Sequence, residues 1–155
     1  MIVGIDPGQV GGIAGIQTSG ECVARPMPVT GKDIDGHAIA AELQALEPEV
    51  VILEKVHAMP KQGVSSTFKF GMGFGLVIGV CEALGIPYRL VTPQAWKKVV
   101  LAGTAKDKDA AISFVRRAYP AVDLTPGRKR VPHDGIADAV CLAEYGRVLM
   151  NKGAA

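Results

Sequence analysis

Four acidic residues lie at positions where carboxylates could act together. Asp6 and Glu54 each follow a short apolar run typical of a buried strand, and Asp134 and Asp138 open the last predicted helix. Charged side chains are seldom buried without a partner, and an i, i+4 spacing places Asp134 and Asp138 on one helical face. Because sites in α/β proteins gather at the carboxyl ends of central strands, these four residues form a candidate site.

Carboxylates from separate parts of a chain repel one another unless a cation lies between them. Mg²⁺ prefers carboxylate oxygens and water as ligands. Two such ions about 4 Å apart activate water and stabilise the leaving oxygen of a phosphodiester. Each acid also has a simpler interpretation: a turn residue for Asp6, a surface charge for Glu54, a helix N-cap for Asp134 and an exposed side chain for Asp138. Taken together, the four favour a metal site.

The rest of the sequence supplies the elements that would position these acids. Alternating apolar residues and turn residues predict three antiparallel strands, at 1–6, 12–17 and 22–29. A helix, a strand, a helix, a strand and three helices follow, at 35–46, 50–53, 65–84, 87–91, 94–101, 104–118 and 133–150. This order predicts one α/β domain over residues 1–155, in which helices flank a mixed five-stranded sheet with two parallel strands.

The composition is that of a globular protein with one strongly basic segment. Hydrophobic residues make up 48% and charged residues 21% of the chain, which argues against disorder. Residues 89–130 contain ten basic and three acidic side chains, a net charge of +7, so the remainder carries −5. This asymmetry slightly favours a polyanionic partner over a merely solvated helical face.

Cysteine usage and hydropathy predict the compartment. Cys22, Cys81 and Cys141 are widely spaced and odd in number, which disfavours a zinc site or a disulfide framework. The longest uncharged apolar stretch, Phe70–Cys81, is shorter than the ~20 residues that a bilayer requires. The chain also starts on a strand-like run without a basic leader. We therefore expect a cytoplasmic protein with no membrane segment.

A glycine repeat marks the predicted helix 65–84. Gly71, Gly75 and Gly79 recur every four residues and share one helical face. Each glycine costs about 1 kcal/mol relative to alanine, so the repeat indicates close approach of another backbone. That backbone belongs either to the sheet or to a second subunit, and helix geometry favours neither.

Taken in order, the motifs resemble those of the RuvC family of Holliday junction resolvases. The acidic motifs are Gly4-Ile-Asp6-Pro-Gly8, Leu53-Glu54-Lys-Val and Asp134-Gly-Ile-Ala-Asp138-Ala, and a basic stretch runs from Val91-Thr-Pro-Gln-Ala-Trp-Lys97 to Ala105-Lys-Asp-Lys108. The resemblance covers nearly the whole chain. It implies an RNase H-like fold, a homodimer, Mg²⁺ or Mn²⁺ with two ions per site, and paired nicks across a four-way DNA junction in recombination and repair. A bacterial or phage-encoded protein fits this family.

The resemblance also implies roles for the acids. Asp6, Glu54 and Asp138 match metal-binding carboxylates of the family. The family's fourth acid falls on Gly135, and the nearest acid here is Asp134. The resemblance therefore leaves two roles open for Asp134, a metal ligand in the catalytic set or a helix cap.

Further roles concern DNA. Lys108 matches a catalytic basic residue near the scissile phosphate and Lys97 a DNA-backbone contact, and they keep the family's spacing of eleven positions. His57 falls where the family carries an aromatic side chain that probes the junction centre, although a surface histidine is an equally good interpretation. Trp96 is better explained by core packing than by base stacking. Phosphate contacts supply much of DNA affinity, and we assign them also to Lys98, Lys106, Arg128, Lys129 and Arg130.

Three alternatives remain at this point. Another RNase H-like nuclease, acting on flaps, other branched DNA, simple duplex or RNA–DNA hybrids, would use the same acids. A phosphotransferase of the actin or sugar-kinase superfamily would need two such domains and a second phosphate loop, and neither the 155 residues nor a Walker A motif provides them. A non-enzymatic binder that kept the fold would not need the full set of acids.

Overall fold

The computed structural model describes residues 1–56, 63–104 and 109–153. His57, Lys106 and Lys108 therefore lie outside the described residues, and so does the side chain of Arg128. The strands are β1 (Ile2–Asp6), β2 (Gly12–Ile16), β3 (Cys22–Pro26), β4 (Val29–Thr30), β5 (Asp33–Ile34), β6 (Val50–Glu54) and β7 (Tyr88–Val91). The helices are α1 (Gly36–Leu46), α2 (Val64–Ala83), α3 (Pro93–Val100), α4 (Ala110–Ala118) and α5 (Asp134–Gly153), with a 3₁₀ turn at Pro126–Arg128.

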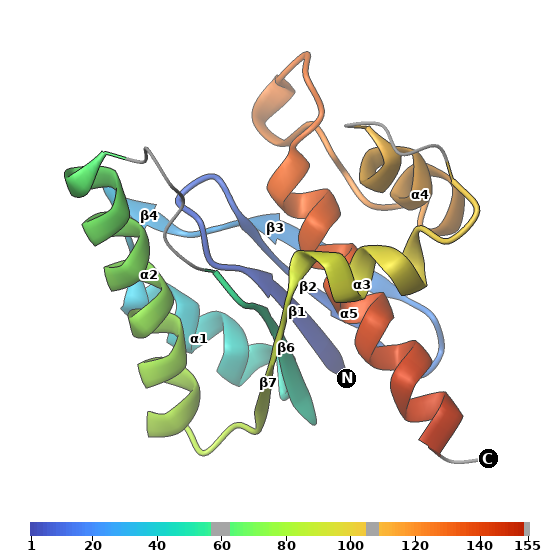
Figure 1. The fold of residues 1–155 in the computed structure, drawn as a ribbon, viewed down its shortest axis with the longest axis horizontal. Coiled ribbons are helices and arrows are strands. Elements are labelled where there is room, and N and C mark those ends of the chain that lie inside the picture. The colour runs from blue at the N-terminus through green and yellow to red at the C-terminus, as the bar shows by residue number, and fades with distance from the viewer. Residues whose placement is uncertain (57–62, 105–108, 154–155) are drawn as a thin grey trace.

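The main sheet has five strands in the order β3-β2-β1-β6-β7 (Figure 1). The first three strands form the predicted antiparallel meander, and β6 and β7 add parallel to β1. The predicted mixed α/β fold is confirmed. The register pairs Ile5 with Leu53. The next residues along these two strands, Asp6 and Glu54, therefore lie side by side at the carboxyl end of the sheet.

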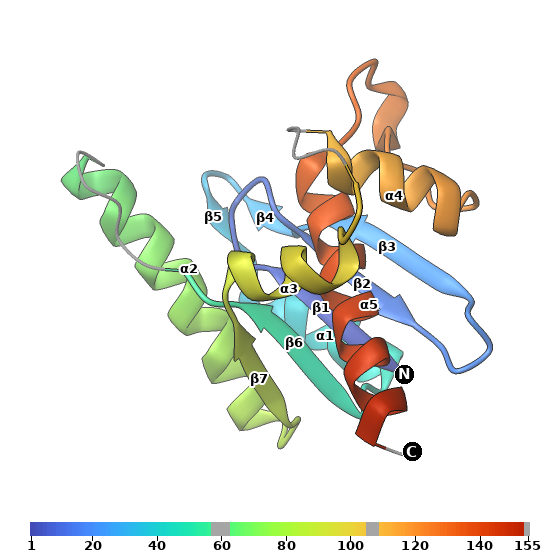
Figure 2. The same cartoon turned by 45° about the vertical axis from the view of Figure 1, so that its right-hand side comes forward.

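Helices cover both faces of the sheet (Figures 1 and 2). Successive side chains of a strand point to opposite faces, and β1 illustrates this. Ile2 packs in a core cluster with residues of α3, α4 and α5. Val3 and Ile5 pack in a second cluster with residues of α1 and α2. The strand that ends on Asp6 is therefore held from both sides.

Helix α5 lies unusually close to β1 because glycines leave room for it. A Cβ atom built on Gly4 would collide with the backbone of Ala139 and Ala143. One built on Gly135 would collide with the backbone of Val10 and Gly11 in the loop after β1. The first turns of α5 thus lie directly against the strand and loop that carry Asp6.

Helix α2 bears on two expectations, the absence of a membrane segment and the role of the glycine repeat. By length and composition alone it could cross a membrane. An 18-residue window within it has a mean hydropathy of 1.4, and 17% of that window is buried in the structure. The sequence prediction missed this because it counted only the uncharged run. Val77 and Cys81 nevertheless pack fully buried in the core cluster of the α1 and α2 face.

A Cβ atom at Gly71, Gly75 or Gly79 would meet no atom of the described residues within 4 Å, so the idea that these glycines face the sheet is wrong.

Smaller differences have local causes. The strand predicted at 22–29 ends at Pro26, and β4 and β5 form a separate two-stranded hairpin. Proline lacks the N–H that would continue a ladder, which explains the break at Pro26 and Pro28. Helix α4 begins at Ala110 rather than at Thr104. The predicted caps of α1 and α3 are confirmed, because Asp35 and Thr92 accept hydrogen bonds from backbone N–H groups of their helices.

Candidate active site

Asp6 ends β1 and is half-buried at the carboxyl end of this central strand. The N–H of Gly8 donates to its Oδ1 over 3.2 Å, and the turn is closed by a 2.8 Å bond from Gly11 N–H to the Gly8 carbonyl. Burial, followed by repulsion from Glu54, raises the pKa of Asp6 to about 6, although the Gly8 N–H and Lys97 oppose the rise. Ionising both Asp6 and Glu54 at this site is therefore unfavourable unless another charge neutralises them.

Glu54 ends the neighbouring strand β6 and is held by a buried indole. Trp96 is fully buried in the core, as predicted, and its Nε1–H donates to Glu54 Oε1 over 2.9 Å. A buried indole N–H requires an acceptor, so this bond fixes one carboxylate oxygen of Glu54. Sequence reasoning missed the contact. The available signal was a buried tryptophan on an element that follows the adjacent parallel strand.

Asp138 reaches the same region from the second turn of α5. Burial, then the charges of Asp6 and Glu54, raises its pKa to about 7; Lys97 opposes the rise and Asp134 adds slightly to it. Two strand ends and one helix thus bring Asp6, Glu54 and Asp138 within each other's electrostatic influence. We call these three residues the carboxylate cluster.

The donor chemistry of the carboxylate cluster fits a hard divalent cation. Its oxygens are the ligands that Mg²⁺ and Mn²⁺ prefer. Burial and then mutual repulsion raise the pKa values of Asp6 and Asp138, and a cation would relieve that repulsion. Across the described ranges, no three His, Cys, Asp or Glu side chains stand in a ready-made ligand geometry. Side-chain movements would therefore have to accompany metal binding.

Asp134 lies in the first turn of α5 and is exposed. It is not the cap that the sequence suggested, because Nδ1 of His133 accepts the N–H of Ile136 over 3.2 Å. Burial and the charge of Lys129 lower the pKa of His133, while Asp134 raises it. A neutral imidazole is the form that accepts this bond, so the helix start is capped by the histidine and Asp134 remains available.

Several of the predicted cations lie on exposed surface, and one of them acts on the carboxylate cluster. Lys97 has its Nζ 5.1 Å from the centroid of the Trp96 ring, and its charge acts on both Asp6 and Asp138. Lys98, Lys129 and Arg130 are exposed. The structure thus places one lysine beside the carboxylate cluster.

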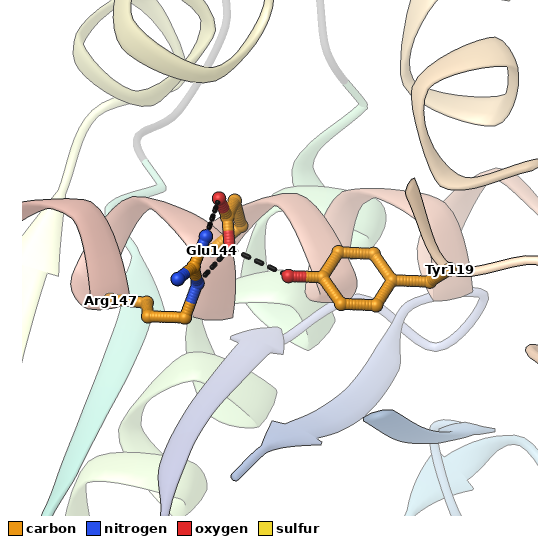
Figure 3. Close-up of polar contacts among 3 residues, drawn as sticks. All are labelled: Tyr119, Glu144 and Arg147. Atoms are coloured by element: carbon orange, nitrogen blue, oxygen red, sulfur yellow. Dashed lines mark hydrogen bonds and ion pairs between the residues drawn. The ribbon is translucent and has the colours of Figure 1, made fainter. Parts of the chain in front are cut away.

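A second buried acid on α5, Glu144, which sequence reasoning missed, has its polar partners within the chain (Figure 3). Arg147 binds the carboxylate of Glu144 through two nitrogens, Nε at 2.6 Å and Nη2 at 2.7 Å, and the hydroxyl of Tyr119 donates to it over 2.7 Å. The Glu144 residue is only 8% exposed. Burial and then the bond to Glu144 raise the pKa of Tyr119, and the bond to Glu144 raises that of Arg147. We call these three residues the Glu144 cluster.

Comparison with known proteins finds likeness over the whole chain. No family model matches the sequence. It is 27% identical to the crossover junction endodeoxyribonuclease RuvC of Nitratidesulfovibrio vulgaris over 168 residues, covering 99% of this chain and 96% of that protein. It is 28% identical to RuvC of Myxococcus xanthus over 124 residues, covering 80% of this chain and 63% of that one.

Solved structures share the fold. Thermus thermophilus RuvC in complex with a Holliday junction substrate superposes with a TM-score of 0.71 at 17% identity, covering 98% of this chain and 95% of that one. A fowlpox virus resolvase in complex with junction DNA gives a TM-score of 0.58 at 18% identity, covering 98% and 99%. The chain therefore has the RNase H-like fold of the RuvC structures, and it is similar in sequence to RuvC along almost its entire length.

Proposed function

We propose that the protein is a structure-selective DNA endonuclease that resolves four-way (Holliday) junctions by paired, metal-dependent hydrolysis of phosphodiester bonds. The observation that carries the proposal is the carboxylate cluster, where two parallel strand ends and α5 bring three acids together and raise the pKa values of Asp6 and Asp138. The full-length similarity to RuvC identifies the substrate class.

Each residue of the site has a distinct task in this proposal. Asp6, Glu54 and Asp138 hold divalent cations, two Mg²⁺ or Mn²⁺ ions in our assignment, and the exposed Asp134 is a further candidate ligand. When bound, such ions activate water and stabilise the leaving oxygen. Trp96 keeps Glu54 oriented through the 2.9 Å bond. Lys108 is assigned to the scissile phosphate because its place in the basic motif matches RuvC proteins.

The cations around the site bind the DNA backbone in this proposal. Lys97, Lys98, Lys129 and Arg130 are exposed on α3 and on the loop before α5. Lys106, Arg128 and His57 are assigned to DNA from their sequence positions. Neutralising phosphates releases counterions, so junction affinity should fall steeply with salt.

Two cuts in one junction require two sites, and α2 offers a surface for a second copy. Val64 and Phe68 are 88% and 72% exposed, and their four-residue spacing lines them up along one side of the helix. The open faces of Gly71, Gly75 and Gly79 let another helix approach closely. We infer a homodimer through α2. Gly75→Leu should shift sedimentation towards the monomer, and an unchanged profile would contradict this interface.

The deciding experiment compares DNA substrates. With Mg²⁺, the protein should nick an immobile four-way junction at symmetric positions on opposing strands. Linear duplex, flap and RNA–DNA hybrid serve as controls. Preferential cutting of a flap or hybrid would favour a different RNase H-like nuclease, and no metal-dependent cutting of any substrate would overturn the proposal. Since the RuvC relatives are bacterial, we place the protein in a bacterial cytoplasm, encoded by the bacterium or by a phage.

A further inference from the structure

A cavity of about 610 Å³ adjoins the loop that carries Asp6. Its walls come from that loop, from the β4–β5 hairpin and from the N-terminal half of α2. Figures 1 and 2 both show the hairpin beside this half of α2, away from the helices of the other face. Binding pockets for small ligands commonly span about 300–1,000 Å³, so the cavity is large enough for a nucleotide.

The cavity comes close to one member of the carboxylate cluster, Asp6. Pro7, which lines it, directly follows Asp6. A Cβ atom built on Gly8 would lie 3.5 Å from Asp6 Oδ1 and 3.7 Å from Cε2 of Phe70. The Phe70 ring, which also lines the cavity, and the Asp6 carboxylate therefore both lie close to Gly8. An occupant of the cavity would be a direct neighbour of a phosphate bound at Asp6.

The lining suits an aromatic anion. Phe70 offers an aromatic ring beside apolar side chains such as Ile34 and Leu76, and Gln9 and Ser66 offer groups that donate and accept hydrogen bonds. Three charged residues line the cavity, Lys32, Lys69 and Asp33, and Asp33 pairs with Lys69 at 3.9 Å. The cavity thus keeps a positive charge, as a phosphate-bearing ligand requires.

We propose that this cavity takes up one unstacked nucleotide of the strand being cut, next to the scissile phosphate. Its base stacks on Phe70, its phosphate lies at Lys32 and Lys69, and Gln9 and Ser66 contact the base edge. Aromatic side chains stack on bases of any sequence, whereas polar side chains distinguish base edges. Phe70 therefore holds the base and Gln9 selects it, which makes the cavity the origin of sequence preference. This inference rests on the proposed junction-resolving function.

The first test detects the unstacked base without any cutting. Immobile junctions carry 2-aminopurine at each position around the crossover in turn, and the protein is added in EDTA so that no divalent ion is present. Loss of base stacking brightens 2-aminopurine. The wild-type protein should brighten one position, and Phe70→Leu, which keeps the apolar bulk without a ring, should remove at least half of that signal. Gln17→Ala, an exposed change at the end of β2, should leave it unchanged.

The outcomes of this test separate the inference from the function on which it rests. Gel-shift binding of the same junctions is measured alongside. Binding without brightening at any position, or equal brightening by Phe70→Leu, would overturn the nucleotide site alone. Failure to bind the junction would overturn the proposed function and this inference together.

The second test measures base selection. Junctions in which the nucleotides flanking the cut are varied are digested with Mg²⁺. The wild-type protein should cut the best and worst sequences with rates that differ by about tenfold, the scale of one well-read base. Gln9→Ala should narrow this ratio to about threefold, while Phe70→Tyr and Gln17→Ala should keep the wild-type ratio. An unchanged ratio in Gln9→Ala, or no preference in the wild-type protein, would overturn the selection.

Discussion

Helix α5 carries two buried or partly buried acids, Glu144 and Asp138, whose partners differ. In the Glu144 cluster, the carboxylate receives two bonds from Arg147 and one from Tyr119 (Figure 3). At Asp138, the described residues form no ion pair, and burial beside Asp6 and Glu54 raises the pKa to about 7. One region is neutralised by the chain itself, whereas in the other we expect a divalent cation to neutralise the acids. The difference separates an acid that stabilises the fold from acids that we propose act in chemistry.

The largest expected effect lies in the carboxylate cluster. Asp6→Asn removes a proposed metal ligand, and ligand-bound metal supplies several kcal/mol to such reactions, so the junction-cutting rate should fall about 10³-fold. Junction binding in EDTA should stay within about threefold, because DNA affinity comes mainly from the cations. Glu144→Gln serves as the contrast and should keep the wild-type rate per folded molecule. Full activity of Asp6→Asn would remove the proposed site.

The next effect is on stability and lies in the other region. Glu144→Ala leaves the Arg147 guanidinium and the Tyr119 hydroxyl without their acceptor, so the free energy of unfolding in urea should fall by about 3 kcal/mol. Glu49→Ala is the matched control, because Glu49 is a 59% exposed partner of the N-terminal ammonium. Its removal should cost less than about 1 kcal/mol. Equal losses for the two variants would mean that the Glu144 cluster contributes no more than a surface pair.

The third effect has the opposite sign at Asp138. Because its folded pKa is raised from 3.8 to about 7, the folded protein binds the proton more tightly than the unfolded chain. The related stability is fully present below pH ~4 and is lost as the pH rises to ~7. In EDTA at pH 8, Asp138→Asn should therefore raise the free energy of unfolding by about 2 kcal/mol, with no gain at pH 4.

Metal binding provides a check on this third effect. Mg²⁺ should stabilise the wild-type protein at pH 8 and stabilise Asp138→Asn much less, since binding to the folded state alone raises stability. The measurement is urea unfolding with and without Mg²⁺ at both pH values. If Asp138→Asn proves less stable than the wild-type protein in EDTA at pH 8, then the chain itself neutralises this acid and the contrast with Glu144 fails.

The smallest effect concerns the groups that orient each acid. Trp96→Phe removes the N–H that binds Glu54 and keeps a ring in the core, so the cutting rate should fall about tenfold, as for groups that position metal ligands. Tyr119→Phe removes one bond to Glu144. It should cost about 1 kcal/mol of stability and leave the rate per folded molecule unchanged. If both variants affected only stability, Trp96 would have no positioning role.

The sequence predicted the elements better than the contacts between them. Alternating apolar residues located the meander, and the apolar run before Glu54 identified a strand buried on both faces. Because parallel neighbours end at one edge, the approach of Asp6 and Glu54 was predictable. The bond from Trp96 to Glu54 was not, since it joins residues 42 positions apart and depends on how α3 packs. The same holds for the bond between Tyr119 and Glu144.

Local competition explains the remaining errors. Asp134 and His133 are both able to begin α5, and only the three-dimensional path of the preceding loop, which bonds the His133 N–H to the Leu124 carbonyl, selects the histidine. The glycine face of α2 was equally compatible with the sheet until the packing of Gly73, Val77 and Cys81 was known. Periodicity identifies a face, but it does not say what covers it.

The close packing of α5 on β1 at Gly4 limits which substitutions this protein can tolerate. Replacing glycine by alanine usually stabilises a protein by reducing the freedom of its unfolded chain. At Gly4 the added methyl group would push against the backbone of Ala139 and lift Asp138 away from Asp6. The spacing of the proposed metal ligands is therefore set by the main chain, and we expect an uncharged, buried substitution at Gly4 to abolish activity as completely as the loss of an acid.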